Sequence, residues 1–498
     1  MTAQVKIAPN IQAVKTGNEN LDNILGGGLA PDRVYLLQGS PGTGKTTLAL
    51  QFLMEGVRQG EKSLYITLSE SKMELESVAA SHGWSLKGVE IFELLTYEDE
   101  LQTDNQYTMY QPSEVELGST NDAILKEVER VKPSRVVLDS LSELKLLAQN
   151  PLRFRRQILA LKNFFTTRSC TVWFLDDKTT TGPESFQLES IAHGVVDLEQ
   201  LSPEFGADRR RLRVKKFRGQ KYRGGYHDFT ILKGGLCIFP RIIPAEHARP
   251  HKKNILKSGV AQMDALVDGG FDDGTSVLLL GPAGIGKSTL ALQYALNAAK
   301  NGDHAVIFTF DESINTIYHR ARGIGMELEK YVEQGLVHLQ PIDPTEMSPG
   351  EFAHRVRQVA GGENGRPTAK VVVIDSLNGY LNAMPEERFL ISQMHELLTY
   401  LGHHGVVTFL VVAQHGLLGH AMHTPVDTSY LADSVILFRY FEADGEVRQA
   451  VSVLKKRSGA HEKTIREFKL GPQGITLGEP LSQFRGILTG TPVQKNIA

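Results

Sequence analysis

Cysteine is nearly absent from this chain: its 498 residues include only Cys170 and Cys237, both in apolar or strand-like surroundings. Two such cysteines do not make the disulfide framework of a small secreted protein, so a reducing compartment is expected. The opening MTAQVKIAPN has no apolar signal segment, and the longest apolar runs, such as VVTFLVVA (406–413), suit a central strand of a parallel sheet rather than a membrane span. These absences predict a cytoplasmic chain with no membrane partner.

The chain also lacks an excess of either charge. Its 54 Lys and Arg residues are balanced by 57 Asp and Glu residues, which gives a net charge of −3. A nucleic-acid partner is therefore not favoured, because such proteins usually carry a basic field. With 41% hydrophobic and 22% charged residues, the composition is that of an ordinary globular chain of two or more domains.

One glycine-rich motif occurs twice. The pattern G-x-x-x-x-G-K-[ST] is met by GSPGTGKT (39–46) and again by GPAGIGKS (281–288). In this motif, the P-loop, glycines let the backbone wrap round a phosphate chain while N–H groups at a helix N-terminus point at the anion. The flanks fit, because RVYLLQ and SVLLLG are typical of buried strands, and TTLALQFLMEGV and STLALQYALNAA of amphipathic helices. A chance glycine-rich turn does not explain two matches in one context.

The two P-loops predict ligands for ATP and Mg²⁺. The lysines would reach the outer phosphates, and the hydroxyls of Thr46 and Ser288 would bind a Mg²⁺ that bridges those phosphates. The predicted nucleotide-binding residues are Gly39, Gly42, Gly44, Lys45, Thr46 and Thr47 in the first loop, and Gly281, Gly284, Gly286, Lys287, Ser288 and Thr289 in the second.

The repetition extends well beyond the loops. Adding 242 to Thr16-Gly17 gives Ser258-Gly259, and adding it to Glu70-Ser71 gives Glu312-Ser313, with no gap between them. We therefore predict a tandem duplication of a whole domain, at 1–245 and 246–498, with a proline-bearing linker at 239–255. Short β-branched runs alternate with helical patterns in each copy. This predicts an α/β fold with a mostly parallel sheet, helices on both faces, and ligands at the carboxyl ends of the strands.

Acidic residues end two predicted strands in each copy. VVLDS and VVIDS are typical of a Walker B strand, in which Asp139 and Asp375 would hold the Mg²⁺ through water. LYITLSES and VIFTFDES end the preceding strand, and they supply the candidates to orient or deprotonate the attacking oxygen, namely Glu70, Asp311 and Glu312. The alternative is that these acids only favour a helix N-terminus beside Ser71 or Ser313. We favour the catalytic role, because the strand ends would face the phosphates.

Together these motifs resemble the KaiC family, RecA-like ATPases built from two fused copies. The likeness rests on the paired P-loops, the Thr-Gly or Ser-Gly ahead of a Gly-Gly pair, the DSL of each Walker B strand, and KFRG…FTI…GLCIFP, and it covers roughly residues 12–492. The resemblance implies two tandem RecA-like P-loop NTPase domains that form a homohexameric double ring with ATP between subunits. It also implies a slow ATPase in the first copy and, in the second, a kinase that phosphorylates its own chain on a Ser and the Thr after it.

The resemblance assigns a role to a basic segment. RRRLRVKKFRGQKYRGG (209–225) carries nine Lys or Arg in its first fifteen residues with two aromatic residues between them, a pattern that also fits a nucleic-acid site or a solvated strand face. The family implies that Lys216 and Arg218 reach the neighbouring subunit's nucleotide in the manner of arginine fingers, and that Lys455 and Arg457 match them in the second copy. We favour this role over nucleic-acid binding.

The chain departs from the family at its catalytic acids. The family's first copy has a pair of glutamates where this chain has Ser69-Glu70, and a weak or altered first-copy ATPase is one consequence. In the second copy the pair becomes Asp311-Glu312, whose leading acid is shorter by one methylene.

The chain departs from the family near its end as well. Alignment of SYLADSVIL on its Asp433 places Ser429 at the family's phosphorylated Ser and Tyr430 at its Thr, so the phosphoacceptor candidates are Ser429 and the preceding Thr428. An ordinary polar loop is the alternative for this segment. The chain stops after FRGILTGTPVQKNIA, so dependence on KaiA is not expected, whereas a KaiB-like partner on the first-copy ring is left open.

Three functions of different classes fit these patterns. The first is an ATPase and Ser/Thr self-kinase that acts as a hexameric signalling or clock-type switch. The second is a RecA- or DnaB-like DNA motor, which the P-loops fit but the net charge does not. The third is a catalytically quiet scaffold that binds ATP to assemble.

Overall fold

The computed structural model describes residues 12–94, 112–178, 185–204, 206–247, 254–362, 365, 367–382, 390–414, 430–488 and 493–494. The chain divides into two compact units, Met1–Arg241 and Ile242–Ala498. The boundary between the two units lies inside the predicted linker at 239–255, although both ends of the described part of that segment are structured. Gly235–Phe239 is a strand, and Ile242 is buried in the second unit's core. The 3-10 helix η1 (Pro244–His247) lies against helix α15 (Leu390–His403), where His403 Nδ1 is 3.0 Å from the Pro244 carbonyl.

The first unit contains a nine-stranded sheet in the order β3-β2-β4-β5-β1-β6-β7-β8-β9. Neighbouring strands are parallel from β3 to β6 and antiparallel from β6 to β9. Its elements are α1 (Glu19–Ile24), β1 (Val34–Gly39), α2 (Lys45–Arg58), β2 (Ser63–Thr67), α3 (Lys72–Ser81), β3 (Val89–Glu93), α5 (Pro112–Val131), β4 (Arg135–Asp139), α6 (Leu141–Ala148), α7 (Pro151–Thr167), β5 (Thr171–Asp177), α8 (Ser185–Ile191), β6 (Gly194–Leu201), β7 (Arg209–Phe217), β8 (Tyr226–Leu232) and β9 (Gly235–Phe239).

The second unit repeats this order as β14-β13-β15-β16-β12-β17-β18-β19-β20. Besides η1 and α15, it contains β10 (Ile255–Leu256), α9 (Ala261–Leu266), β11 (Phe271–Asp272), β12 (Ser276–Gly281), α10 (Lys287–Lys300), β13 (Ala305–Thr309), α11 (Ile314–Gly323), α12 (Leu328–Glu333), β14 (Val337–Pro341), α13 (Pro349–Ala360), β15 (Val371–Asp375), α14 (Leu377–Asn382), β16 (Val407–Ala413), β17 (Ser434–Ala443), β18 (Glu446–Lys456), β19 (Arg466–Gly471), β20 (Gly474–Pro480), β21 (Phe484–Arg485) and β22 (Val493–Gln494).

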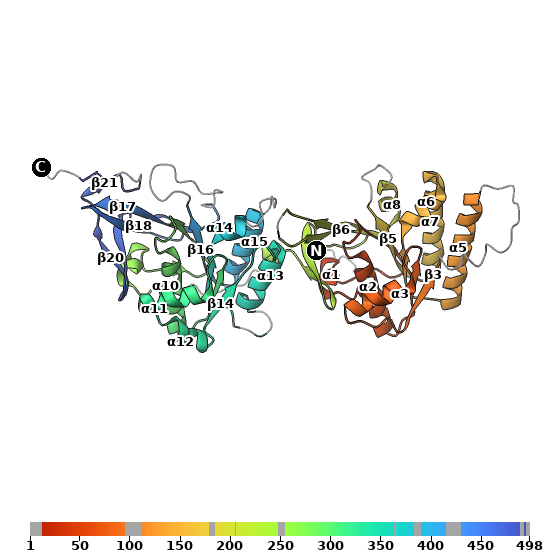
Figure 1. Ribbon diagram of the computed structural model, residues 1–498, viewed down its shortest axis with the longest axis horizontal. Helices are drawn as coiled ribbons and strands as arrows, with labels where there is room; N and C mark the ends of the chain where they lie inside the picture. Colours follow the sequence, from red (N-terminus) through yellow and green to blue (C-terminus); the bar gives the residue numbers. More distant parts are fainter. Residues whose placement is uncertain are drawn as a thin grey trace, which may run out of the picture. The chain divides into compact units, whose positions relative to one another are not determined.

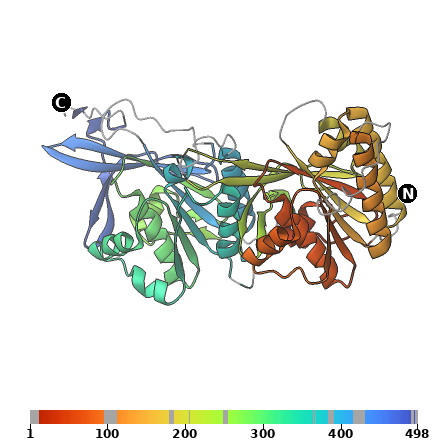
Figure 2. The ribbon, with the colours of Figure 1, turned by 45° about the vertical axis from the view of Figure 1, so that its right-hand side comes forward.

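Helices cover both faces of each sheet, as predicted. Along β1, Tyr35 and Leu37 face the core built with α1, α2 and α3, whereas Val34 and Leu36 face the core built with α5, α6, α7 and α8. Figure 1 labels these helices in two groups, and Figure 2 shows the orange helices of the second group packed side by side. Because side chains alternate along a strand, a sheet covered on both faces needs apolar residues at every position. This is why the strands appear in the sequence as unbroken apolar runs.

The predicted strand–loop–helix units are confirmed in both copies. β1 leads into α2 and β12 into α10, and both helices begin at the P-loop lysine. Across the described residues, the structure contains no helix long and apolar enough to cross a bilayer. In each unit, therefore, a P-loop follows the carboxyl end of a central parallel strand.

Candidate functional site

Each P-loop helix begins without a side-chain cap. The residues at the cap positions, Gly44 and Gly286, have φ of 96° and 100° and no capping side chain. A Cβ on Gly44 would lie 2.8 Å from Ile231 Cδ1, and one on Gly286 would lie 2.7 Å from Phe468 Cε1. Glycine is therefore required for both conformation and space. The uncapped N–H groups of the first turn, with the helix dipole behind them, are suited to bind an anion.

The P-loop lysines are buried and turned toward their own loops. Lys45 Nζ lies 3.0 Å from the carbonyls of Gly39 and Ser40, and 2.7 Å from Asp177 Oδ1 at the end of β5. Lys287 Nζ contacts the carbonyls of Gly281 and Pro282 at 2.9 and 2.6 Å. The strand position of Asp177, opposite the first P-loop glycine, holds Ala413 in the second unit. Burial lowers the pKa of Lys287 to about 8, although Asp375 raises it in part.

The predicted metal ligands lie together in both units. Asp375 accepts a hydrogen bond from Ser288, while Asp139 accepts one of 2.5 Å from Tyr65, whose hydroxyl is also hydrogen-bonded to Thr46. Burial raises the pKa of both aspartates, and neither forms an ion pair with a described residue. Hydroxyl and carboxylate oxygens are the donors that Mg²⁺ prefers, and a buried carboxylate without a cation partner favours one. These residues thus fit a Mg²⁺ ion.

Glu70 is available for chemistry because other residues cap the next helix. Ser71 and Glu74 form the capping box of α3, so Glu70 is not needed for that purpose. The Thr67 hydroxyl holds the Glu70 backbone through bonds of 2.7 and 2.9 Å, and Glu70 Oε2 is buried without a hydrogen-bond partner. Burial, followed by repulsion from Asp139, Glu74 and Asp177, raises the pKa of Glu70 to about 7, while Lys45 lowers it. A pKa near 7 suits a general base at neutral pH.

The acids of the second unit have partners instead. The exposed Asp311 accepts a 2.5 Å hydrogen bond from the Ser376 hydroxyl. Both carboxylate oxygens of Glu312 contact Arg320 Nη1, at 2.6 and 2.5 Å. The backbone of Glu312 is held by Thr309 in the way that Thr67 holds Glu70. The two copies therefore share the backbone of the acidic strand end but not the surroundings of its carboxylate.

The predicted finger cations lie toward the amino ends of the parallel strands, opposite the end that carries the P-loop. Strand register places Lys216 beside Val195 and Val195 beside Leu36, which is three residues, or roughly 10 Å, before the P-loop along β1. Lys216 Nζ and Arg218 Nη2 donate to the Ser190 carbonyl at 3.3 and 3.0 Å. Burial, with Arg218 and Lys162 nearby, lowers the pKa of Lys216.

The second unit places its cations in the same way. Lys455 pairs with Val435, which pairs with Leu278, three residues before that P-loop. Lys455 Nζ donates to the Ala432 carbonyl at 2.7 Å, and Arg457 lies 3.4 Å from Asp433. In neither unit does register bring these cations to the P-loop of the same unit.

The profile of the KaiC ATPase family matches residues 14–242 and again residues 256–482. The chain belongs to the KaiC family. It is 27% identical over 492 residues to the circadian clock protein KaiC3 of Synechocystis sp. (strain PCC 6803), with 97% of this chain and 95% of that protein covered. It is 28% identical over 498 residues to the circadian clock oscillator protein KaiC of Prochlorococcus marinus subsp. pastoris, with 98% and 94% covered. This family membership makes the chain a tandem-repeat ATPase that binds ATP.

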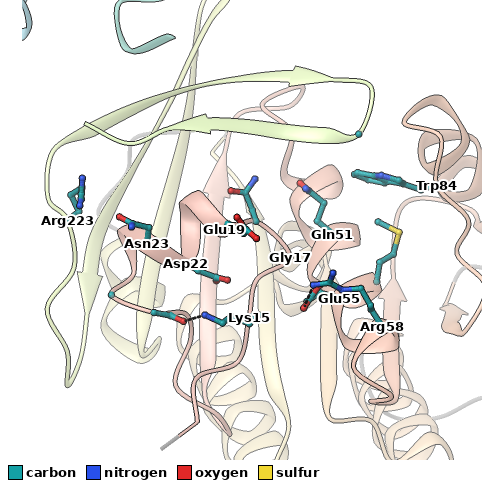
Figure 3. A pocket seen from close by; sticks show the side chains of 15 residues that line it. Lys15, Gly17, Glu19, Asp22, Asn23, Gln51, Glu55, Arg58, Trp84 and Arg223 are labelled. Atoms are coloured by element: carbon teal, nitrogen blue, oxygen red, sulfur yellow. Dashed lines mark hydrogen bonds and ion pairs between the residues drawn. The ribbon is translucent and has the colours of Figure 1, made fainter. Parts of the chain in front are cut away.

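The predicted phosphoacceptors cannot be placed, and one cavity belongs to none of the predicted sites. Ser429 and Thr428 lie outside the described residues, and only the next residue, Tyr430, is seen, with an exposed fraction of 50%. A large cavity of about 930 Å³ lies instead beside α1 and the far half of α2 (Figure 3). Glu55 and Arg58 form a 2.7 Å ion pair on its wall, and its lining includes none of the predicted nucleotide, metal or catalytic residues. We assign it no part in ATP chemistry.

Sequence reasoning missed several residues around the KaiC-type sites. Tyr65, Asp177 and Arg320 each contact a predicted site residue in one unit only. The gapless alignment of the two copies at an offset of 242 indicates two of them, because it pairs Tyr65 with the apolar Ile307 and Arg320 with the apolar Val78. A difference in polarity between otherwise matching copies was the clue.

The raised pKa of Glu70 predicts that the charged form of this side chain destabilises the folded chain at high pH. The neutral form is favoured in the folded chain, so this stabilisation is complete below the ordinary pKa of 4.5 and is lost as the pH rises through about 7. Glu70→Gln mimics the neutral form and should raise the unfolding free energy by about 1–2 kcal/mol at pH 8, less than the full pKa shift implies because solvent screens a partly exposed group. The gain should shrink at pH 5. Thermal unfolding without nucleotide or Mg²⁺ measures it, with the exposed Glu76→Gln as control. A gain that is larger at pH 5 would contradict the assignment.

Tyr65 predicts a difference in metal affinity between the two sites. Tyr65→Phe removes the hydroxyl that orients Asp139, and loss of such a supporting bond should weaken Mg²⁺-dependent nucleotide binding at the first site roughly tenfold. Fluorescent ATP titrated against Mg²⁺ in a Lys287→Ala background reports this site alone. Tyr35→Phe, which loses a bond to the Ala30 carbonyl, is the matched control. Equal Mg²⁺ dependence in both variants would rule out the role.

Proposed function

We propose that this KaiC-family ATPase hydrolyses Mg²⁺-ATP at sites completed by neighbouring subunits of a homohexamer, and that it acts in the cytoplasm as a nucleotide-dependent signalling or clock-type switch. One observation carries the proposal. In each unit the buried lysine, the predicted metal ligands and the strand-end glutamate gather at the carboxyl end of the parallel strands, whereas the predicted finger cations lie toward the amino end. The names of the relatives, which include circadian clock proteins, support the clock-type role.

The residues at the first site divide the work of hydrolysis. The uncapped turn of α2 binds the phosphates, and Lys45 exchanges Asp177 for the outer phosphates. Mg²⁺, held by Thr46 and Asp139, would neutralise charge on the phosphates. Glu70 accepts a proton from the attacking water as the oxygen bonds to the γ-phosphorus and the bond to the β–γ bridging oxygen breaks, which releases ADP and phosphate.

The separation between each P-loop and the finger cations of the same unit supports a ring. A cation that cannot reach its own P-loop can serve the next subunit, and such a head-to-tail contact closes into a ring when the rotation is suitable. Lys216, Arg218, Lys455 and Arg457 would then stabilise the transferring phosphoryl group in trans. A KaiB-like protein is the partner we propose for the first-domain ring.

The self-kinase activity is proposed for the second domain. Ser429 and Thr428 are the acceptors, with Asp311 and Glu312 as the acids near the transferred phosphoryl group. Tyr430 stands at the family's Thr position, so a two-site cycle on Ser and Thr is not proposed.

Pairing of the basic strand argues against the DNA motor. Arg211 and Arg213 of β7 lie opposite Glu199 and Asp197 of β6 and form ion pairs with them at 2.9 and 3.2 Å. Lys215 pairs with Glu189 at 2.9 Å. Cations that are already paired with carboxylates attract phosphate weakly, so these ion pairs reduce the positive charge that nucleic-acid binding would need.

Labelled ATP tests the proposed enzyme directly. With Mg²⁺ and γ-labelled ATP, the purified chain should release phosphate and carry label on a peptide within 420–435. Lys45→Ala and Lys287→Ala should each lower the turnover rate at their own site by about 10²-fold or more. Mass spectrometry locates the label, and Ser429→Ala with Thr428→Ala should abolish it. Label that persists in that double variant would refute the acceptor assignment. ATP-dependent assembly with no phosphate release would support a scaffold instead.

A further inference from the structure

Arg320 stands where its first-domain counterpart has no charge. Helices α3 and α11 match over their whole length at the offset of 242, from Lys72–Ser81 to Ile314–Gly323, and this offset pairs Val78 with Arg320. Val78 packs beside the first-domain core, whereas Arg320 turns back to Glu312, which precedes the N-cap of its own helix. The same backbone thus carries an apolar side chain in one copy and a guanidinium in the other.

The guanidinium occupies the whole carboxylate of Glu312. Arg320 Nη1 lies 2.6 Å from Oε1 and 2.5 Å from Oε2, and both side chains are about three-quarters buried, with exposed fractions of 28% and 25%. In the first domain, Glu70 makes no ion pair with a described residue, and its Oε2 has no hydrogen-bond partner. An ion pair this sheltered is screened much less than one at the surface.

A carboxylate held in this way is a poor general base. To take a proton from an attacking oxygen it needs a free lone pair directed at that oxygen, and here both carboxylate oxygens are directed at Arg320 Nη1. Arg320 also lies close enough to the predicted metal ligand Asp375 to lower the pKa of that carboxyl, although burial raises it more. The second site therefore has a built-in competitor for its base.

We propose that Arg320 is a positioning residue that clamps Glu312 and holds ATP turnover in the second domain below that of the first. This inference rests on the proposed hydrolytic function and adds an internal brake on one of its two sites. The clamp also makes the two sites chemically different, because Glu70 in the first domain has the same backbone position as Glu312 but no such ion pair with a described residue. Release of Glu312 becomes the event that activates the second domain.

The test compares substitutions at the matched positions. In a Glu70→Gln background, which silences the first site, Arg320→Val should raise kcat for phosphate release at least fivefold with little change in KM. Arg320→Lys keeps the charge and should stay near the parent rate. Arg322→Val, on the same helix but paired with Glu329 at the surface, is the control that should change nothing. The reciprocal Val78→Arg, made in a Glu312→Gln background, should lower first-domain kcat by a similar factor.

The outcomes separate the brake from the proposed function. An increase in Arg320→Val that disappears when Glu312→Gln is added supports the clamp. An unchanged or lower kcat in Arg320→Val, with an unfolding midpoint like that of the parent, overturns it and makes Arg320 a phosphate ligand or a bystander. If the unfolding midpoint falls, the reciprocal Val78→Arg variant decides, since a clamp must slow the first site. Phosphate release at background level in every chain, the unsubstituted one included, would overturn the proposed function and the clamp with it.

Discussion

The nucleotide sites depend on two helices that begin uncapped. Gly44 and Gly286 leave the first-turn N–H groups of α2 and α10 without an internal acceptor, and Ile231 and Phe468 close the space in which any other side chain would stand. The free N–H groups at a helix N-terminus cost free energy unless an anion or water accepts their hydrogen bonds. The lysine, the hydroxyl, the Walker B aspartate and the strand-end glutamate all lie near this point because parallel strands end there together.

Duplication has kept this framework while the side chains around it diverged. The sheet order and the positions of the P-loop helices are the same in both units. The Walker B aspartate is nevertheless bonded to Tyr65 in one and to Ser288 in the other, and Asp177 has Ala413 as its counterpart. Apolar packing fixes the backbone, and polar residues at the strand ends then tune each site by charge and hydrogen bonding.

Strand pairing gives the basic segment its character. Read along the chain, nine cations in fifteen residues suggest a surface for a polyanion. In the folded domain the same strand lies against β6, which carries Asp197 and Glu199 at the opposing positions, so that much of the charge is met within the sheet. Lys216 and Arg218 differ from Arg211 and Arg213 because they donate to the Ser190 carbonyl of α8, and the register places Val195 rather than a carboxylate opposite Lys216.

The sequence by itself determined the duplication, the α/β class with both sheet faces covered, the P-loops, and the strand-end acids, because these depend on local spacing and on apolar periodicity. The boundary between the units lies within the linker expected at 239–255, but the packing of Ile242 and η1 into the second core was not predicted, since it depends on contacts more than a hundred residues away. Only the tertiary structure decided the surroundings of each acid. Glu70 and Glu312 look alike in sequence, but Arg320 is 8 residues further along the chain from Glu312, and only the fold brings its guanidinium against that carboxylate while Glu70 Oε2 has no hydrogen-bond partner.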